Sequence, residues 1–550
     1  MLRFLSLSRG CAVLHYMEIV ESETEAVEGE WQIAASLNIV GVHMAVLNTG
    51  KVLLFSADMH DYAAINRGQS ALYDPVNDDV TYPDLSRNLF CSGHCILPDG
   101  RLLAAGGQSC AQVPWQIIIS LLGFGRGADH DIHTFDPVTE TWSRHRDMPR
   151  ARWYPTCVTL PDGKALIVAG YWHHCIAPMA ERLTGSDRLA MNVSCEIFDP
   201  VTSTLTAPQP FLKEIGLYPF LHVLPGGFLF VHSGNKTRLF DLNKKEWLPQ
   251  VFTMNSPGTR TYPGQGSSVL LPILPDDPTA RVLIVGGSTA LKPDEDTPAT
   301  DRVEIFELNI RHPHESRWRE TTPLANPRIL VDASLLPDGS VLVINGAERG
   351  VADHNHGEVL EAERFDPATE TWQRMAPAEV ARLYHSTAVL LPDGRVLTAG
   401  STGHEWPPDR NELRLEVFSP PYLARGPRPV IDRTPSQVTY GETFDVETGD
   451  AQSITSVALI RPTTTTHNNN MDQRYVGLQI DEKTPWQLTV VAPPDPALAP
   501  PGDYMLFIVN SDGVPSTARF FRLHSDSPGN AATRASRRQT RRRLAPAGTS

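Results

Sequence analysis

The sequence lacks a hydrophobic run long enough to cross a membrane, and its cysteines lack the spacing of a zinc site. No stretch of about 20 apolar residues occurs, so no membrane span is predicted. The apolar segment VPWQIIISLLGFG at 113–125 is too short for one, and we interpret it as a buried insertion. The seven cysteines are odd in number and match no zinc pattern, so we interpret most of them as small buried residues in strands.

Positive charge is also scarce, except near the end of the sequence. The formal net charge is −15, which argues against nucleic acid as the main partner. Arginines crowd into residues 526–550, which we interpret as a disordered basic tail, with a functional basic arm as the alternative. Residues 1–30 are interpreted as an N-terminal tail. They show no convincing hydrophobic region or cleavage site, so a signal peptide is not expected.

One hairpin pattern is repeated along most of the sequence. An apolar run, a turn such as Pro-Asp-Gly and a second apolar run recur at intervals of roughly 45 to 65 residues. Asp-Gly between two apolar runs is a strong β-hairpin signal. The seven copies cover residues 40–57, 92–107, 156–170, 220–234, 267–287, 332–346 and 385–400. Their number and spacing are typical of the blades of a kelch-type β-propeller.

A second phrase, Phe-Asp-Pro followed by a tryptophan, comes after several of these hairpins. We expect the Asp-Pro to form a turn between two outer strands, and Trp142 and Trp372 to pack between neighbouring blades. The phrase and its variants lie at 133–149, 195–208, 237–250 and 363–377.

The repeat stops near residue 423, where a proline-rich connection begins. Short alternating strands between 427 and 525 predict a small antiparallel sandwich. The predicted fold class is therefore all-β. A seven-bladed kelch-type β-propeller over residues 31–423 is followed by a small immunoglobulin-like β-sandwich over residues 427–525.

Unusual polar residues lie just before some of the hairpins. Tyr384 and His385 precede one hairpin, and Cys91 and Tyr154 occupy comparable positions before two others. His467 lies between four threonines and three asparagines, in a polar hairpin tip suited to reaching away from its own domain. Imidazole and phenolate ligands suit copper(II). Each residue alone is more often packed or hydrogen-bonded than functional, so the pattern by itself indicates only polar residues at blade entrances.

The segments that carry these residues resemble those of the galactose oxidase and glyoxal oxidase family of copper radical oxidases. LFCSG resembles the segment with the cross-linked cysteine, and RWYPT resembles the segment with the cross-linked tyrosine. RLYHS resembles the paired axial tyrosine and histidine, and THNNNMDQRYVGL resembles the C-terminal motif with the second histidine. FSPPYL and PPGDYMLFIVNSDGVPS resemble the flanks of the same C-terminal domain. The resemblance covers about residues 30–525.

The resemblance implies a copper-dependent oxidoreductase that oxidises a primary alcohol or aldehyde with O2 and releases H2O2. Its substrate would be a small-molecule alcohol, aldehyde or carbohydrate. Cys91 and Tyr154 would form a thioether that acts as a radical cofactor. Tyr154, Tyr384, His385 and His467 would be the copper ligands, and Tyr384 would also take the proton of the substrate hydroxyl.

Trp172 occupies the position of the tryptophan that stacks on the cofactor in galactose oxidase, so the resemblance implies the same role here. Four more metal-ligating side chains follow Cys91 and Trp172 closely in the sequence. We interpret these four as structural, and they are His94, Cys95, His173 and His174.

Other interpretations stay open. A catalytically silent propeller would act as a carbohydrate-binding or protein-interaction module, although such a scaffold has no reason to keep all the core residues. A copper protein without the radical would have a binding or redox-protection role. The family resemblance implies a secreted or cell-surface protein, whereas the missing signal peptide leaves a cytoplasmic location open. No carbohydrate-binding module is expected before the propeller. Substrate identity, set by loops such as 108–130 and 401–413, and the oligomeric state are also left open.

Overall fold

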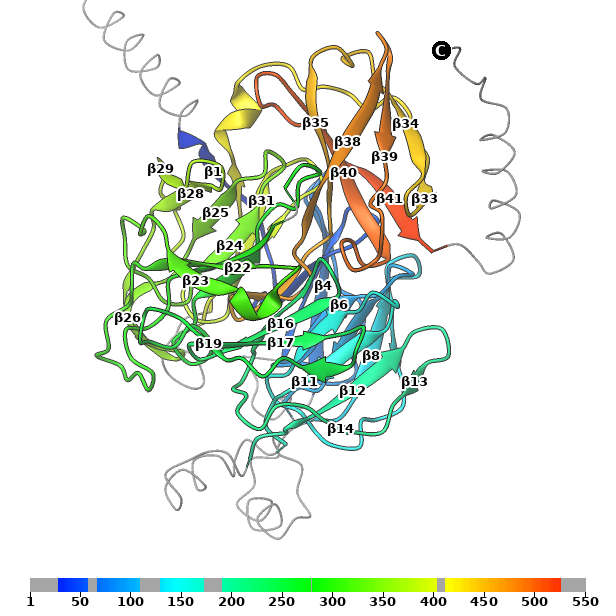
Figure 1. The fold of residues 1–550 in the computed structure, drawn as a ribbon. Helices are drawn as coiled ribbons and strands as arrows, with labels where there is room; N and C mark the ends of the chain where they lie inside the picture. Colours follow the sequence, from blue (N-terminus) through cyan, green and yellow to red (C-terminus); the bar gives the residue numbers. More distant parts are fainter. Residues whose placement is uncertain are drawn as a thin grey trace, which may run out of the picture.

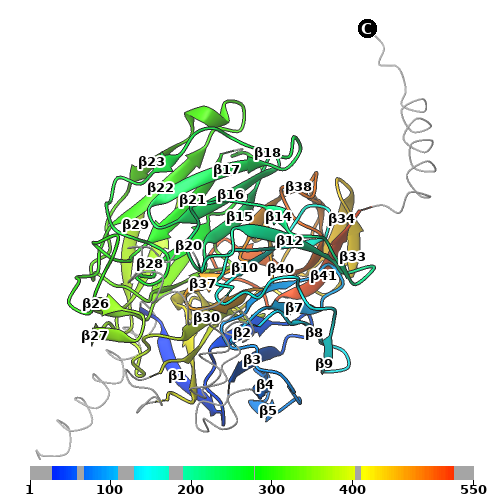
Figure 2. The same ribbon diagram turned by 90° about the horizontal axis from the view of Figure 1, so that it is seen from below.

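Seven antiparallel sheets stand around a common axis, and each begins with one of the predicted hairpins. The computed structural model describes residues 28–57, 67–108, 129–172, 190–277, 279–402 and 411–525. Figure 2 shows β37 near the middle, with the innermost strands of several blades around it. This is the predicted seven-bladed β-propeller. Within the described ranges, no helix is long and apolar enough to cross a membrane.

Each blade has four strands, which follow one another from the axis to the rim. Blade 1 comprises β2 (His43–Val46), β3 (Val52–Ala57), β4 (Gly68–Asp74) and β5 (Asp79–Thr81), and blade 2 comprises β6 (Gly93–Ile96), β7 (Leu102–Ala105), β8 (Ile132–Asp136) and β9 (Thr141–Arg144). Blade 3 comprises β10 (Thr156–Thr159), β11 (Ala165–Val168), β12 (Ser194–Asp199) and β13 (Thr204–Leu205). Blade 4 comprises β15 (Phe220–Leu224), β16 (Phe228–Ser233), β17 (Lys236–Asp241) and β18 (Glu246–Trp247). Short strands β14 (Gln209–Pro210) and β19 (Phe252–Thr253) extend blades 3 and 4.

The remaining three blades follow the same order. Blade 5 comprises β20 (Ser267–Leu270), β21 (Ala280–Val285), β22 (Val303–Leu308) and β23 (Arg317–Glu320). Blade 6 comprises β24 (Asp332–Leu335), β25 (Val341–Ile344), β28 (Ala362–Asp366) and β29 (Thr371–Met375). Blade 7 comprises β30 (Ser386–Leu390), β31 (Val396–Gly400), β32 (Arg414–Ser419) and β1 (Glu30–Ser36). An extra hairpin, β26 (Ala347–Val351) with β27 (His354–Glu358), is inserted within blade 6, and two 3-10 turns are η4 (Pro313–Glu315) and η5 (Pro421–Ala424).

The ring is closed by strands from two distant parts of the sequence. β1 pairs antiparallel with β32, from Glu30 opposite Ser419 to Ser36 opposite Arg414. Figure 1 shows the blue strand β1 beside the green strands β28 and β29 rather than among the other blue strands. Because closure pairs the outer edge of the last blade, the ring does not leave a long open edge there.

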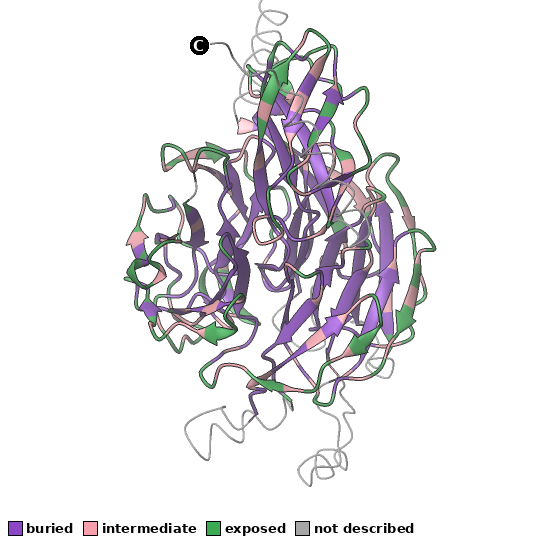
Figure 3. Cartoon of the chain, turned by 45° about the vertical axis from the view of Figure 1, so that its right-hand side comes forward, coloured by how far each residue is buried: buried purple, intermediate pink, exposed green. Residues whose placement is uncertain are grey.

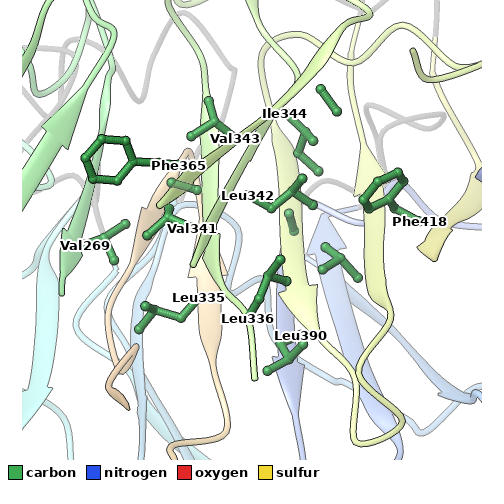
Figure 4. Close-up of a cluster of buried hydrophobic side chains, with 14 of the residues drawn as sticks. Val269, Leu335, Leu336, Val341, Leu342, Val343, Ile344, Phe365, Leu390 and Phe418 are labelled. Carbon is green, nitrogen blue, oxygen red and sulfur yellow. The ribbon is translucent and has the colours of Figure 1, made fainter. Parts of the chain in front are cut away.

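Apolar side chains fill the spaces between blades, and the two predicted tryptophans take part. Figure 3 shows buried residues along the inner strands of the ring and exposed residues mainly at its rim. Figure 4 shows part of the largest cluster, in which Leu342 and Leu390 come from neighbouring blades 6 and 7. The Trp142 ring lies 5.4 Å from that of Phe55 in blade 1, and Trp372 Nε1 donates to a carbonyl oxygen at residue 322. The predicted packing of both tryptophans between blades is confirmed.

Three blades also bury an arginine–glutamate ion pair. In each pair the arginine comes from the loop before an inner strand, and the glutamate comes from the third strand of the same blade. Arg328 Nη2, for example, donates to Glu363 Oε1 at 2.7 Å, with both side chains almost inaccessible to solvent. The pairs are Arg152–Glu196, Arg260–Glu304 and Arg328–Glu363. They fix the entrance of the inner strand to the body of its own blade.

The C-terminal domain is one seven-stranded sheet with its own apolar core. Its strands, in spatial order, are β33 (Gln437–Thr439), β41 (Arg519–His524), β40 (Gly502–Asn510), β35 (Ile454–Ile460), β38 (Tyr475–Lys483), β39 (Gln487–Val491) and β34 (Thr443–Glu447). Figure 1 shows this domain, in yellow to red, on one side of the propeller. β38 pairs with β35 through its first half and with β39 through its second half, so this strand is shared by the two sheets of the sandwich and joins all seven strands. The predicted immunoglobulin-like fold is confirmed, with one difference: β33 pairs parallel with β41, whereas all strands were expected to be antiparallel.

A polar hairpin of this domain, β36 (Thr464–Thr466) with β37 (Asn469–Asn470), lies inside the propeller. β36 pairs antiparallel with β2, so blade 1 gains two inner strands from another domain. Residues 464–474 form hydrogen bonds with all seven blades, through their side chains in six blades and through the backbone carbonyl group of Asn468 in blade 5. Their partners, in blade order, are Val42, Ile96, Thr156, Val223, Ser267, Ala333 and Ser386.

Replacing Arg328 by alanine should destabilise the protein strongly, because Glu363 would remain buried without its partner. We expect Arg328→Ala to lower the free energy of unfolding by about 3–5 kcal/mol. Arg302 forms an ion pair with Glu320 in which both side chains are half exposed, so Arg302→Ala should cost only about 0–1 kcal/mol. Urea denaturation followed by tryptophan fluorescence measures both. Equal losses in the two variants would contradict this account of the buried pair.

Candidate metal centre

Four side chains from three distant segments meet near the axis of the propeller. They are Tyr154 at the entrance of blade 3, Tyr384 and His385 at the entrance of blade 7, and His467 at the tip of the axial hairpin. None is more than 5% exposed. The ring of His467 lies 4.7 Å from those of Tyr154 and His385 and 5.4 Å from that of Tyr384, between centroids. The two tyrosines and two histidines predicted to bind one metal ion therefore lie together.

The backbone at this site is held in a conformation that residues other than glycine rarely adopt. Cys91, Tyr154, His385 and His467 have φ values of 66°, 62°, 68° and 49°. Such left-handed conformations cost roughly 1–3 kcal/mol each and persist only where the surrounding structure enforces them. The first three lie one or two residues before an inner strand, where the chain turns into the blade. The turn directs their side chains toward the axis instead of along the strand.

The two imidazoles each present one nitrogen atom without a hydrogen-bond partner. Nδ1 of His385 pairs with Thr402 Oγ1 at 2.9 Å, and Nδ1 of His467 pairs with Thr466 Oγ1 at 2.6 Å. Thr466 Oγ1 already donates its only proton to the Val42 carbonyl oxygen, so His467 Nδ1 must carry the proton of the imidazole. Both Nε2 atoms are buried and have no partner in the part of the chain that the structure describes. The lone pair of His467 Nε2 is therefore free to bind an electrophile.

The two phenols are in direct contact. The hydroxyl groups of Tyr154 and Tyr384 form a short hydrogen bond with each other. Burial raises the pKa of both phenols well above the ordinary value. The pKa of Tyr154 is raised further by the charges of Cys91 and Tyr384, and that of Tyr384 by the charge of Tyr262. Burial also lowers the pKa of His385 to about 3. The site therefore holds protonated phenols and neutral imidazoles, and a phenolate would need a nearby positive charge.

Cys91 lies against Tyr154. Its thiol is buried, and burial raises the thiol pKa well above its usual range, although the nearby Tyr154 and Trp153 side chains lower it in part. The backbone amide of Tyr154 donates to the Cys91 carbonyl oxygen at 3.1 Å. The two residues that were predicted to form a covalent pair are thus held together by the backbone as well as by side-chain contact.

Trp153 covers one face of Tyr154, an arrangement not predicted from the sequence. The two rings are stacked, with centroids 3.7 Å apart and planes inclined by 14°. Tyr218 stacks on Tyr154 as well, at 4.5 Å. The role predicted for Trp172 stays a prediction; this side chain is 37% exposed, and it follows Tyr171, whose ring stacks on Trp153 at 5.7 Å.

A buried carboxyl group connects the segments that carry the two histidines. Ser386, which follows His385, donates to Asp332 Oδ2 at 2.8 Å and accepts from Asn468 Nδ2 at 3.2 Å. Asn468 in turn follows His467 in the sequence. This chain of hydrogen bonds fixes the distance between the two imidazoles through their neighbouring residues.

The donor set fits a transition metal that accepts nitrogen and phenolate oxygen. The described residues contain no group of three or more His, Cys, Asp or Glu side chains that could hold a metal ion. A centre at this site must therefore use the phenols, and two imidazoles with two phenolates match the preferences of copper(II). The buried, unpartnered Nε2 atoms are the direct sign that a ligand is expected here.

The other sequence candidates divide into two groups. Cys95 packs with Cys157 in the core between blades 2 and 3, as a structural residue would. His94 lies near the site and bonds to another imidazole, that of His43, which the sequence analysis did not single out. His173 and His174, most of the loops 108–130 and 401–413, the segment 113–125 and the tail 526–550 lie outside the described residues.

Comparisons with known proteins agree over most of the chain. A family model described as glyoxal oxidase N-terminus matches residues 55–422, and one described as galactose oxidase-like, Early set domain, matches residues 428–523. Aldehyde oxidase GLOX of Vitis pseudoreticulata is 30% identical over 90% of this chain and 97% of its own length. A galactose oxidase of Gibberella zeae is 26% identical over 90% of this chain and 70% of its own. A solved structure of a fungal alcohol oxidase of the AA5 family, in complex with copper, is similar in fold, with a TM-score of 0.71 at 23% identity, covering 90% of this chain and 99% of that chain.

Asp332 should make the stability of the metal-free protein depend on pH. Burial raises its pKa from 3.8 to about 6, so between these values the unfolded chain is ionised while the folded chain keeps the proton. The contribution of Asp332 to the free energy of unfolding should therefore fall by about 2 kcal/mol as the pH rises from 4 to 7. Asp332→Asn removes this contribution. The free energy of unfolding of both proteins is measured by urea denaturation at pH 4 and pH 7 with a chelator present. The variant should become more stable relative to the wild type at pH 7. The same difference in free energy at both pH values would contradict the assignment.

Proposed function

Since the chain belongs to the glyoxal oxidase family, whose members are oxidoreductases, we propose that it is a copper radical oxidase. It would oxidise a primary alcohol or aldehyde group of a small molecule with O2, giving the aldehyde or acid and H2O2. The observation that carries the proposal is the pair of buried, unpartnered Nε2 atoms of His385 and His467 beside two phenol oxygens in contact. Buried polar atoms are usually paired, and two unpartnered nitrogen atoms beside two phenols match the donor set of a metal site.

The four side chains Tyr154, Tyr384, His385 and His467 would hold the copper ion. Copper would supply Lewis acidity toward a substrate oxygen and would accept one electron. The hydroxyl groups of Thr402 and Thr466 orient the two imidazoles through Nδ1 and leave both Nε2 atoms available to bind the metal. The chain thus provides a preformed pocket of ligands rather than one that must rearrange.

Tyr384 is the residue best placed to take the proton from the substrate hydroxyl. Its phenol lies at the entrance of blade 7 and is held by the hydrogen bond with Tyr154. Because burial raises its pKa so far, the phenolate form is a strong base in this environment. A Tyr384 phenolate would therefore become a phenol readily when a substrate hydroxyl comes within reach.

Tyr154 would carry the radical. A thioether between the Cys91 sulfur and the Tyr154 ring would lower the energy needed to oxidise the ring, and the oxidised ring would remove a hydrogen atom from the substrate carbon. Trp153 and Tyr218 stack on the ring and shield it from water and from side reactions. In the complete reaction an alcohol, or an aldehyde that has first added water, loses two hydrogen atoms, and O2 gains them as H2O2.

Copper binding should depend on His467. The full-length protein should bind one copper(II) ion per chain, more tightly at higher pH because the phenols must lose protons. His467→Ala should weaken binding by more than the roughly 10- to 100-fold loss that follows removal of a ligand's hydrogen-bond partner. His222, equally buried in blade 4, provides the control variant His222→Ala. Metal analysis after dialysis against a competing chelator measures both; copper retained by His467→Ala would refute the assigned ligand.

The covalent pair should appear as a mass change. After metal-free protein is incubated with copper under air, the intact mass should fall by that of two hydrogen atoms. Peptide mapping should locate the change in a linked pair of peptides that hold Cys91 and Tyr154. Cys91→Ala should keep the copper ligands, show no mass change and lose most oxidase activity, measured as peroxide release from alcohols and aldehydes. Free Cys91 and Tyr154 in copper-loaded wild type would exclude the radical mechanism and favour a binding protein.

A further inference from the structure

The residues at the entrances of blades 2, 3 and 4 are linked by a chain of backbone hydrogen bonds. Cys91, Tyr154 and Tyr218 all have left-handed backbones and lie two residues before their inner strands. The amide of Tyr218 donates to the Tyr154 carbonyl oxygen at 3.0 Å, and the amide of Tyr154 donates to the Cys91 carbonyl oxygen at 3.1 Å. In blades 3 and 4, the residue that precedes the inner strand is thus hydrogen-bonded to the corresponding residue of the blade before it. Cys91 begins this chain, so its own amide needs a different acceptor.

An imidazole takes the place of the missing carbonyl group. The amide of Cys91 donates to Nε2 of His43, in the inner strand of blade 1, at 3.0 Å. His43 is fully buried, and its ring is stacked on Phe55 with centroids 4.5 Å apart and planes inclined by 7°. The bond fixes Cys91 at the backbone atom next to its strained φ angle.

A second imidazole fixes the orientation of the first. His43 Nδ1 lies 3.1 Å from Nε2 of His94, which is also fully buried. Since His43 Nε2 accepts the proton of the Cys91 amide, the His43 proton lies on Nδ1 and is donated to His94 Nε2. The His94 proton then lies on Nδ1, which has no partner among the described residues. In this series of hydrogen bonds Cys91 donates to His43, and His43 donates to His94.

The surroundings keep both imidazoles neutral. Burial lowers the pKa of His94 to about 3, and burial together with His94 and His385 lowers the pKa of His43 well below its usual range. The titratable side chains that act on the pKa of His43 are those of His94 and His385. The ring of His467 also lies nearby, 6.0 Å from that of His43 between centroids. No charge in this group competes for the His43 lone pair that accepts the Cys91 amide.

We propose that His43 and His94 are positioning residues for the covalent cofactor. They hold the backbone of Cys91 in the conformation that presents its thiol to the Tyr154 ring. This inference rests on the proposed function, since it concerns how the Cys91–Tyr154 bond forms. Neither histidine touches the substrate or binds the metal in this scheme.

The reaction that they assist is an oxidation by O2. The S–H bond of Cys91 and one ring C–H bond of Tyr154 break, and one C–S bond forms. Two protons and two electrons leave the pair and reduce one O2 to one H2O2. The step requires the sulfur atom to stay close to one ring carbon atom, which is the geometry that the Cys91 backbone sets.

The test is the rate of bond formation, read as intact mass against time in full-length, metal-free protein after copper and air are added. In His43→Leu the Cys91 amide loses its acceptor, and the mass change should be about tenfold slower. His43→Gln should restore the rate, because the amide oxygen of glutamine can accept the same proton. His94→Leu, which only frees the His43 ring to turn, should be slowed as well. His222→Leu removes a buried imidazole far from Cys91 and should match the wild type.

Each outcome decides the inference. Slow His43→Leu and His94→Leu, with normal His43→Gln and His222→Leu, would support it. His43→Leu or, if that variant does not fold, His94→Leu with the wild-type rate would overturn it while leaving the proposed function intact. Equal slowing in His222→Leu would also overturn it, because the effect would then reflect general destabilisation. Wild type that binds copper without losing mass would instead overturn the proposed function, and the inference with it.

Discussion

The structure depends on a polar hairpin that satisfies the inner edges of the blades. The innermost strand of a propeller blade faces the axis with unpaired backbone amides and carbonyl groups, which are costly to bury without partners. Residues 464–474 supply those partners, by strand pairing with β2 and by side-chain and backbone hydrogen bonds that reach all seven blades. The requirement for hydrogen bonds explains why a segment this buried is made of threonine, asparagine, aspartate and glutamine rather than apolar residues.

The candidate centre follows from that arrangement. The hairpin places His467 at the axis, and the segments before the inner strands of blades 3 and 7 place the other proposed ligands beside it. The same burial that excludes water raises the pKa values of the phenols and lowers those of the imidazoles, so the site is neutral before a cation arrives. Such a site favours a divalent ion, because binding can be balanced by the loss of two phenol protons.

Local signals made the propeller predictable from the sequence, whereas the finer packing of the site was not. Turns between apolar runs, four of the seven of them Asp-Gly, specify hairpins without reference to the rest of the chain, and the number of hairpins predicted the number of blades. Trp153 was missed because neighbouring residues in an extended strand point to opposite faces. The left-handed backbone of Tyr154 removes that alternation and lets the two rings stack. His43 was missed because it lies within an apolar strand, VGVHMAV, and meets Cys91 only through the ring.

Two features of the chain together determine when the site can come into being. Closure of the ring joins β1 to β32, and the axial hairpin follows later in the sequence, within the second domain. During synthesis the blades emerge first, and domains generally fold in that order. The segments that carry the two tyrosines and His385 are therefore synthesised before the segment that carries His467, the fourth proposed ligand. Completion of the C-terminal domain acts as a safeguard: a half-made polypeptide lacks both the fourth proposed ligand and the hairpin that satisfies the inner strands, so redox chemistry would be deferred until the whole protein exists.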